Sequence, residues 1–245
     1  MRAGGDREIP NNRTSDTTFV LDADGTLFDL CDSIGSIYAR VAQVHGLHLD
    51  PQKIDGAVRA IWSGFQDEYL NAHHGYATSP ERERAVWGAF IHRVFGQCTE
   101  ARISAALEED VYSAFADPTI RSLAAGAEAF LTRASTAGVG VVVATNNDIR
   151  TRVCLSGMEI YPRLVAEVFL AQDIGWKKPS AKFFKGIADT LGIPTGSIIH
   201  VGNDRKLDVD AAIESGCRAV LYDPHSRHPS FPGPVVRSFE ELLLP

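Results

Sequence analysis

Short apolar runs alternate with amphipathic stretches through the second half of the chain. The runs are rich in β-branched residues, and they cover residues 139–145, 164–171, 197–203 and 217–223. Continuous apolar runs of this length are typical of strands that are buried on both faces of a sheet. The stretches between them open with proline or stop at glycine, which predicts helices over residues 126–137, 179–191 and 205–215. This alternation predicts a parallel sheet with helices on both faces, and residues 19–22 add one more strand.

Between the first strand and the rest of this sheet, the spacing of apolar residues becomes helical. Apolar side chains recur at steps of three and four residues, and the pattern covers residues 33–47, 54–70, 83–96 and 103–115. No strand-like run interrupts it. The sequence therefore predicts an α/β fold, a Rossmann-like parallel sheet with an inserted all-helical domain. We expect a flexible tail at 1–17, the α/β core at 18–29 plus 118–245, and the helical domain at 30–117.

Composition and charge restrict the classes of partner. Of the 245 residues, 44% are hydrophobic and 22% are charged, an ordinary balance for a globular protein with a sizeable core. The formal net charge of −7 argues against a nucleic-acid partner, because phosphate backbones require a basic surface. No apolar stretch approaches the ~20 residues that span a bilayer, and the N-terminal segment lacks the apolar middle region of a secretion signal.

The cysteines are scattered along the chain without a close pair, at Cys31, Cys98, Cys154 and Cys217. This spacing suits free thiols in a reducing cytoplasm better than disulfides or a zinc site. We therefore expect a cytoplasmic protein that binds neither nucleic acid nor a membrane. A monomer or a weak homodimer is the default expectation for its oligomeric state.

Polar residues follow four of the predicted strands at the point where each strand ends. In chain order they are Asp22, Asp24, Gly25 and Thr26, then Thr145 and Asn146, then Lys178, and finally Asn203, Asp204 and Asp208. The carboxyl ends of parallel strands meet at one edge of a sheet, where ligands bind. We therefore expect these side chains to form a single site.

The residue types in this set favour phosphoryl chemistry with a divalent cation. Carboxylates near further oxygen ligands are what Mg²⁺ prefers, with waters and a substrate phosphate completing its shell. A hydroxyl, a lysine and helix N-termini are suited to hold a phosphoryl group. One aspartate can attack phosphorus directly. The other lies two positions on, points the same way along an extended backbone, and can donate and later accept the proton.

The motifs Asp-x-Asp-Gly-Thr, Thr-Asn, Lys-Pro and Gly-Asn-Asp-x-x-x-Asp, in this order, resemble those of the haloacid dehalogenase-like (HAD) superfamily. The resemblance covers the chain from Phe19 to Leu243, and the helical insertion resembles the helical (C1) cap of this family. Most members are Mg²⁺-dependent phosphatases. The resemblance therefore implies a phosphoric monoester hydrolase that acts on a small phosphorylated metabolite through an aspartyl-phosphate.

The resemblance also implies a role for each motif residue. Asp22 would be the nucleophile and would bind Mg²⁺ through its other oxygen, and Asp24 would be the general acid and base, with its backbone carbonyl on the metal. Thr145 and the Asn146 amide would hold the phosphoryl oxygens. Lys178 would neutralise charge on the nucleophile and the phosphate. Gly25 and Thr26 complete the first motif, and Asp208 matches the final acid of the last one.

Asn203 departs from the family pattern, because it stands where the family usually has a metal-binding aspartate. An amide oxygen can ligate Mg²⁺ but brings no charge. The favoured reading makes Asn203 the ligand with Asp204 assisting, and the alternative is that Asp204 supplies the carboxylate directly or through water. Lys177 competes with Lys178 for the catalytic lysine, and the register of Pro179 favours Lys178.

Two other functions compete with a phosphatase. A haloacid dehalogenase-type hydrolase uses the same first aspartate without a metal, but that branch typically lacks the second aspartate, which this chain has as Asp24. A non-catalytic relative would bind a ligand in the site, or a protein through the helical insertion. Apart from Asn203, every expected catalytic side chain is present, which favours the enzyme.

Overall fold

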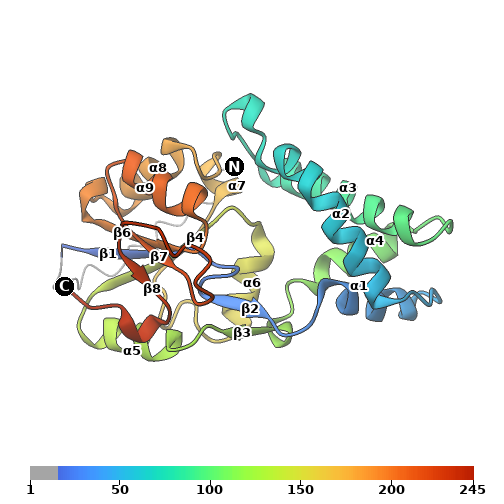
Figure 1. Ribbon diagram of the computed structural model, residues 1–245, viewed down its shortest axis with the longest axis horizontal. Coiled ribbons are helices and arrows are strands. Elements are labelled where there is room, and N and C mark those ends of the chain that lie inside the picture. Colours follow the sequence, from blue (N-terminus) through green and yellow to red (C-terminus); the bar gives the residue numbers. More distant parts are fainter. Residues whose placement is uncertain (1–15) are drawn as a thin grey trace, which may run out of the picture.

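The computed structural model describes residues 16–245, so nearly all of the tail expected at 1–17 lies outside the described residues. Within this range, a parallel sheet covered by helices stands beside a bundle of helices (Figure 1). The strand order of the sheet is β5-β4-β1-β6-β7-β8, and all neighbours run parallel. The strands are β1 (Thr18–Leu21), β4 (Gly140–Thr145), β5 (Val168–Leu170), β6 (Ile198–Gly202), β7 (Arg218–Tyr222) and β8 (Val235–Val236). The predicted α/β fold is confirmed.

Strand β1 packs against two separate cores because its side chains alternate between the faces of the sheet. Phe19 and Leu21 belong to the core that also contains residues of α5 (Ala127–Thr136) and α6 (Ile149–Gly157). Val20 belongs to the core of the opposite face. That face is covered by α7 (Ala171–Ile174), α8 (Ala181–Leu191) and α9 (Ala211–Glu214). Burial on both faces explains why the strands read as continuous apolar runs.

The chain reverses its direction of travel across the sheet at β1. Strand β1 pairs with β4 on one side and with β6 on the other, and the chain reaches β6 only after β4 and β5 have been laid down. Such a reversal leaves a crevice at the carboxyl ends of the central strands. The motif residues that follow β1, β4 and β6 are therefore brought to one edge.

The helical insertion has an apolar core of its own, centred on residues such as Phe65, Phe90 and Phe95. Its helices are α1 (Ile34–Val44), α2 (Pro51–Leu70), α3 (Pro80–Cys98) and α4 (Ala105–Ala114), close to the four predicted stretches. Each begins after a residue whose side chain accepts a first-turn N–H, namely Ser33, Asp50, Ser79 and Ser104. The domain boundaries given above stay a prediction.

The structure differs from the predicted elements at three places. Strand β5 covers only Val168–Leu170, because Leu164 and Val165 form a turn in which their N–H groups donate to the Ile160 carbonyl. The predicted helix at 205–215 opens as a π-helical segment, Arg205–Asp210, before α9. Two strands that were too short to predict, β2 (Phe28–Leu30) and β3 (Arg121–Leu123), pair antiparallel beside the insertion.

Within residues 16–245, no helix combines the length and apolarity needed to cross a membrane.

Candidate active site

Asp22, Lys178 and Asp208 form a buried ion cluster at the carboxyl edge of the sheet. The Lys178 ammonium lies 2.6 Å from Asp22 Oδ1 and 2.6 Å from Asp208 Oδ1. Thr26 donates its hydroxyl to the other oxygen of Asp22, at 3.2 Å. On the far side, Asp208 Oδ1 lies 3.0 Å from Nε2 of the fully buried His200. Residues from three distant parts of the chain thus meet in one cluster.

Asn146 holds the backbone of Lys178 in place. Its side-chain oxygen accepts the Lys178 N–H at 2.7 Å, and its side-chain nitrogen donates to the Lys178 carbonyl at 2.9 Å. This reciprocal pair links the end of β4 to the loop before α8 and fixes where the lysine side chain starts. Because the side-chain amide is occupied in this way, the backbone N–H of Asn146 is the amide that suits a substrate contact. The neighbouring Thr145 hydroxyl accepts the Asn147 N–H at 3.1 Å and keeps its own proton to donate.

The cluster holds two carboxylates and one ammonium, and the pKa values of the two carboxylates shift in opposite directions. Burial raises the pKa of Asp22 to about 7, against the opposing pull of Lys178. Burial acts in the same direction on Asp208, but Lys178 and His200 overcome it and hold its pKa below the usual value. Burial works to lower the pKa of Lys178, and the two carboxylates outweigh it and raise that pKa. One negative charge is left without a partner, so a second cation near Asp22 would keep that carboxylate ionised.

The donors beside Asp22 fit a hard cation such as Mg²⁺. Gly25 has φ 77°, and a side chain there would lie 2.3 Å from Nδ2 of Asn203, so the Asn203 amide rests directly on the backbone that follows Asp24. The Asp22 carboxylate, the Asp24 carbonyl and the Asn203 side-chain oxygen are all hard oxygen donors. Within residues 16–245, no group of three or more His, Cys, Asp or Glu side chains is arranged to hold a metal. A site here would depend on the amide and the carbonyl.

Asp204 has a structural task that the sequence did not indicate. Its Oδ1 accepts the N–H groups of Lys206 and Leu207, each at 2.8 Å, and so caps the π-helical segment. Its own N–H donates to Asp208 Oδ2 at 2.9 Å. One carboxylate oxygen is therefore committed to the backbone, which favours Asn203 over Asp204 as the metal-facing residue of this pair.

Asp24 is held by two residues that the sequence analysis did not select, Arg121 and Asn147. The Arg121 guanidinium lies 3.3–3.4 Å from Asp24 Oδ1, and the Asn147 side chain donates to the other oxygen. Arg121 also donates to the Phe115 carbonyl at 2.6 Å, at the end of α4. Burial raises the pKa of Asp24, and Arg121 opposes that rise. Asn147 adjoins the second motif and was within reach of sequence reasoning, whereas Arg121 lies on an edge strand that carries no motif.

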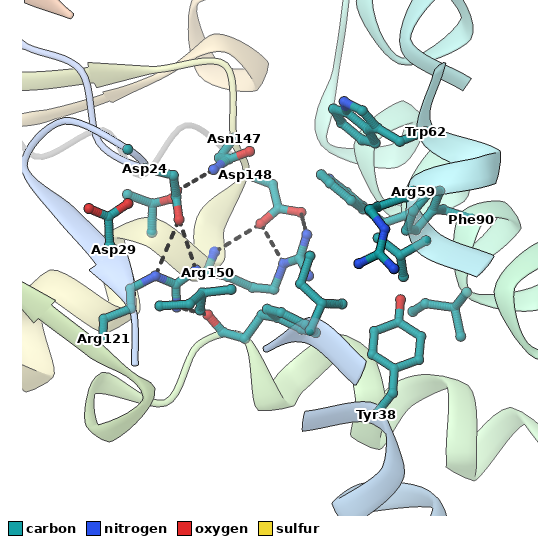
Figure 2. A pocket seen from close by; sticks show the side chains of 18 residues that line it. Asp24, Asp29, Tyr38, Arg59, Trp62, Phe90, Arg121, Asn147, Asp148 and Arg150 are labelled. Carbon is teal, nitrogen blue, oxygen red and sulfur yellow. Dashed lines mark hydrogen bonds and ion pairs between the residues drawn. The ribbon is translucent and has the colours of Figure 1, made fainter. Parts of the chain in front are cut away.

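A cavity of about 710 Å³ opens between the α/β core and the helical insertion, with Asp24 and Gly25 in its wall. Asp24, Arg121 and Asn147 lie at the core end, and Tyr38, Arg59, Trp62 and Phe90 lie at the end formed by the insertion (Figure 2). Between them, the buried Asp148 caps α6 and pairs with Arg150, Nε to Oδ1 at 2.8 Å. The wall is mostly apolar and aromatic, so a molecule with its reactive group at Asp24 would extend along these rings.

Lys177 points away from the site and joins the core to the insertion. Its ammonium lies 2.9 Å from Glu83 of α3, and neither side chain is exposed to solvent. It also donates to the Tyr69 carbonyl at 2.9 Å. The Tyr69 hydroxyl in turn donates to the Asn146 carbonyl at 2.9 Å. Lys177 thus joins the two parts of the chain, whereas Lys178 contacts Asp22, as the sequence analysis expected.

The predicted site residues gather at one edge, with Asp204 turned to helix capping. Comparison with known proteins identifies the family of the chain. A family model described as haloacid dehalogenase-like hydrolase matches residues 17–216. Over 227 residues the chain is 25% identical to haloacid dehalogenase-like hydrolase domain-containing protein 3 of Danio rerio, covering 90% of this chain and 92% of that relative.

A shorter segment of the chain is similar to an enzyme whose name gives its substrate. Over 71 residues the chain is 34% identical to the 5-amino-6-(5-phospho-D-ribitylamino)uracil phosphatase YigB of Escherichia coli (strain K12), covering 29% of this chain and 27% of that protein. Among solved structures, the HAD-hydrolase YfnB of Bacillus subtilis bound to magnesium superposes with a TM-score of 0.71 at 16% identity. That superposition covers 92% of this chain and 96% of YfnB, and at this identity it supports the fold alone.

Proposed function

The chain belongs to the haloacid dehalogenase-like hydrolases, and we propose that it is a Mg²⁺-dependent phosphatase that acts on a small phosphorylated metabolite. The observation that carries the proposal is the Lys178 ammonium, 2.6 Å from both Asp22 and Asp208, in a buried site whose neighbour Asp24 faces a cavity. This arrangement suits a reaction in which the Asp22 carboxylate attacks phosphorus and Asp24 transfers a proton. The phosphatase identity of YigB agrees with it over the matched segment.

The residues act in two steps. An Asp22 oxygen attacks phosphorus, the ester bond breaks, and the leaving oxygen takes a proton from Asp24. Asp24 then removes a proton from a water, which attacks the aspartyl-phosphate, releases phosphate and restores Asp22. The Thr145 hydroxyl and the Asn146 backbone N–H hold the phosphoryl oxygens, while Lys178 offsets the charge that gathers between Asp22 and the phosphate.

Asp22, the Asp24 carbonyl and Asn203 are the groups that would hold Mg²⁺. When bound, the ion supplies charge neutralisation and orientation of the phosphate. The net negative charge of the Asp22–Lys178–Asp208 cluster is the feature that favours a second cation. Because Asn203 brings no charge, we expect weaker Mg²⁺ binding than an aspartate would give at this position.

Carbon–halogen hydrolysis is the second candidate, since it uses the same first aspartate. That reaction needs neither a metal nor an acid at the second position. Here Asp24 is present in a partly buried place, and both Arg121 and Asn147 hold its carboxylate in position. The contacts of Asp24 therefore favour phosphate ester hydrolysis.

Metal dependence tests the proposed function directly. With p-nitrophenyl phosphate, we expect phosphate release in Mg²⁺ that falls at least about a hundredfold in EDTA and returns when Mg²⁺ is added back. Replacing Asn203→Asp should lower the Mg²⁺ concentration that gives half-maximal activity, because a charged ligand replaces a neutral one. Halide release from a 2-haloacid in EDTA, with no phosphate release in Mg²⁺, would contradict the proposal.

Arg121 is a positioning residue, and its effect should depend on how much the leaving group needs an acid. Arg121→Gln should lower kcat/KM about ten- to a hundredfold for an alkyl phosphate, whose leaving oxygen requires a proton from Asp24. The loss should be much smaller for p-nitrophenyl phosphate, whose leaving group departs as an anion. Equal losses on both substrates would show that Arg121 matters only for folding. Arg218→Gln, an exposed arginine of β7, is the control that should change neither value.

A further inference from the structure

The cavity beside Asp24 has polar groups at its distant end that have no partner among residues 16–245. Tyr38 is only 3% exposed, yet no hydrogen bond to its hydroxyl is present among residues 16–245. The Arg59 guanidinium likewise has no hydrogen bond or ion pair within that range. Figure 2 shows the two groups pointing toward each other at the insertion end of the cavity. The Arg59 side chain is exposed, so its guanidinium is free to pair with an anionic ligand in the cavity, and the Tyr38 hydroxyl lies beside it as a hydrogen-bond donor.

The other charges of the cavity wall are already balanced, with one exception at the opposite end. Arg121 pairs with Asp24 at 3.3 Å, and Arg150 pairs with Asp148 at 2.8 Å. Asp29 lines the cavity without an ion pair and lies at the core end, near Arg121 (Figure 2). Arg59 is therefore the cation at the insertion end that still lacks a counter-charge. A second anionic group, carried by the leaving group, would be attracted at the Arg59 end.

The wall between the two ends is aromatic. Trp62 and Phe90 contact each other, with ring centroids 5.8 Å apart, and both line the cavity with Trp87 and Phe115. A polar chain would lose hydration against these rings without gaining hydrogen bonds, whereas a flat apolar body would pack on them. A volume of about 710 Å³ also exceeds what a two- or three-carbon leaving group fills.

We propose that the substrate is a phosphate monoester whose leaving group has an apolar, ring-containing body and ends in an anionic group that Arg59 and Tyr38 bind. This inference rests on the proposed function, because it takes Asp24 as the group that faces the leaving oxygen. Arg59 supplies the charge, and the Tyr38 hydroxyl donates a hydrogen bond. Burial raises the pKa of Tyr38, so the hydroxyl keeps its proton at physiological pH. Trp62 and Phe90 pack on the body between the two anionic ends.

Matched substrates test the anion site. We would compare para-substituted phenyl phosphates that carry a carboxylate on the ring, through one methylene or through two, each with its neutral carboxamide. For at least one spacer, wild-type kcat/KM should favour the carboxylate about tenfold or more, the worth of one charge-assisted hydrogen bond. Arg59→Gln should bring that ratio close to one, Arg59→Lys should keep part of it, and Tyr38→Phe should lower it. Phosphoglycolate, an anion without the apolar body, should be a poorer substrate.

Arg102→Gln is the matched control, because it removes the same charge from an exposed residue of the insertion outside the cavity wall, and the ratio should not change. A binding measurement separates this inference from the proposed function. Isothermal titration with the corresponding para-hydroxyaryl carboxylates and carboxamides reports on the anion site without catalysis. Tighter binding of the carboxylate, lost in Arg59→Gln, supports the site even if no phosphate ester is hydrolysed.

The outcomes are distinct. If p-nitrophenyl phosphate is hydrolysed but carboxylate and carboxamide substrates react and bind equally, the anion site is refuted while the phosphatase stands. If carboxylates bind through Arg59 but no ester is hydrolysed, the phosphatase is refuted while the site stands. If a carboxylate preference survives Arg59→Gln and Tyr38→Phe unchanged, the anion binds elsewhere and the inference is wrong.

Discussion

Asp22→Asn is expected to lower phosphate release by at least about a thousandfold, to the level of the uncatalysed background. The amide of the variant cannot attack phosphorus, so no phosphorylated intermediate forms, although the residues around position 22 are unchanged. The Lys178 ammonium, 2.6 Å from Asp22, would keep its second partner Asp208, so the fold should be retained. Stopped assays with p-nitrophenyl phosphate in Mg²⁺ measure the loss, and circular dichroism checks the fold.

Asp189→Asn is the matched control for that variant, since Asp189 is an exposed aspartate of α8 whose side chain pairs with the surface Lys185. Its activity should equal that of the wild type. Acid quenching during turnover should also trap phosphate on the wild-type chain and none on the Asp22→Asn chain. A variant that keeps more than a few per cent of wild-type activity would refute Asp22 as the nucleophile.

Glu83→Gln is expected to cost about 3–5 kcal/mol of unfolding free energy near pH 7, because it leaves the Lys177 ammonium buried without a counter-charge. Neither side chain of this pair is exposed, and the Glu83 carboxylate also accepts the Thr78 hydroxyl. The pair lies where the insertion meets the core: Lys177 N–H donates to the Tyr76 carbonyl at 2.8 Å, and Thr78 N–H donates to the Gly175 carbonyl at 3.0 Å. Urea unfolding followed by tryptophan fluorescence measures the difference.

The effect of Glu83→Gln should depend on pH, because burial lowers the pKa of Lys177 from 10.5 to about 8. Between these values the unfolded chain holds a proton that the folded chain has released, so the Lys177 contribution to stability rises with pH in that window. Without Glu83 the pKa of Lys177 falls further, since the carboxylate is the charge that opposes the shift. The variant gains stability with rising pH where the folded wild type still holds its proton, so the gap between them should narrow as the pH rises to about 8 and stay constant above it.

Glu81→Gln provides the comparison, as Glu81 lies in the same first turn of α3 but is exposed. Its loss of stability should be a small fraction of that of Glu83→Gln, and its gap to the wild type should not change as the pH rises to about 8. Equal losses in the two variants would mean that the buried pair contributes nothing beyond a surface carboxylate. Retained stability in Glu83→Gln would mean that Lys177 releases its proton at no net cost.

Most of the architecture was predictable, because its causes are local or periodic. Strands buried on both faces must be apolar throughout, which identified β1, β4, β6 and β7. Helices with one buried face must repeat their apolar residues at three- and four-residue steps, which located α1 to α4. Parallel strands bring their carboxyl ends to one edge, so motif residues far apart in the chain, such as Asp22 and Lys178, were expected to meet. Single interactions within the site follow no such rule.

The sequence by itself determined the kinds of element, their order and the chemical groups at the edge of the sheet. Only the tertiary structure decided that Arg121 holds Asp24 and that Lys177 joins Glu83 instead of entering the site. It also decided that Tyr38 and Arg59 face an aromatic cavity, where neither has a partner within the described part of the chain. These outcomes depend on the packing of two bodies against each other. A charge on an amphipathic helix reads the same in a sequence whether it meets water, a counter-charge or a ligand, because its partner comes from a distant segment. The free energy of a charged side chain depends on that partner and on its burial, and the local sequence pattern predicts neither.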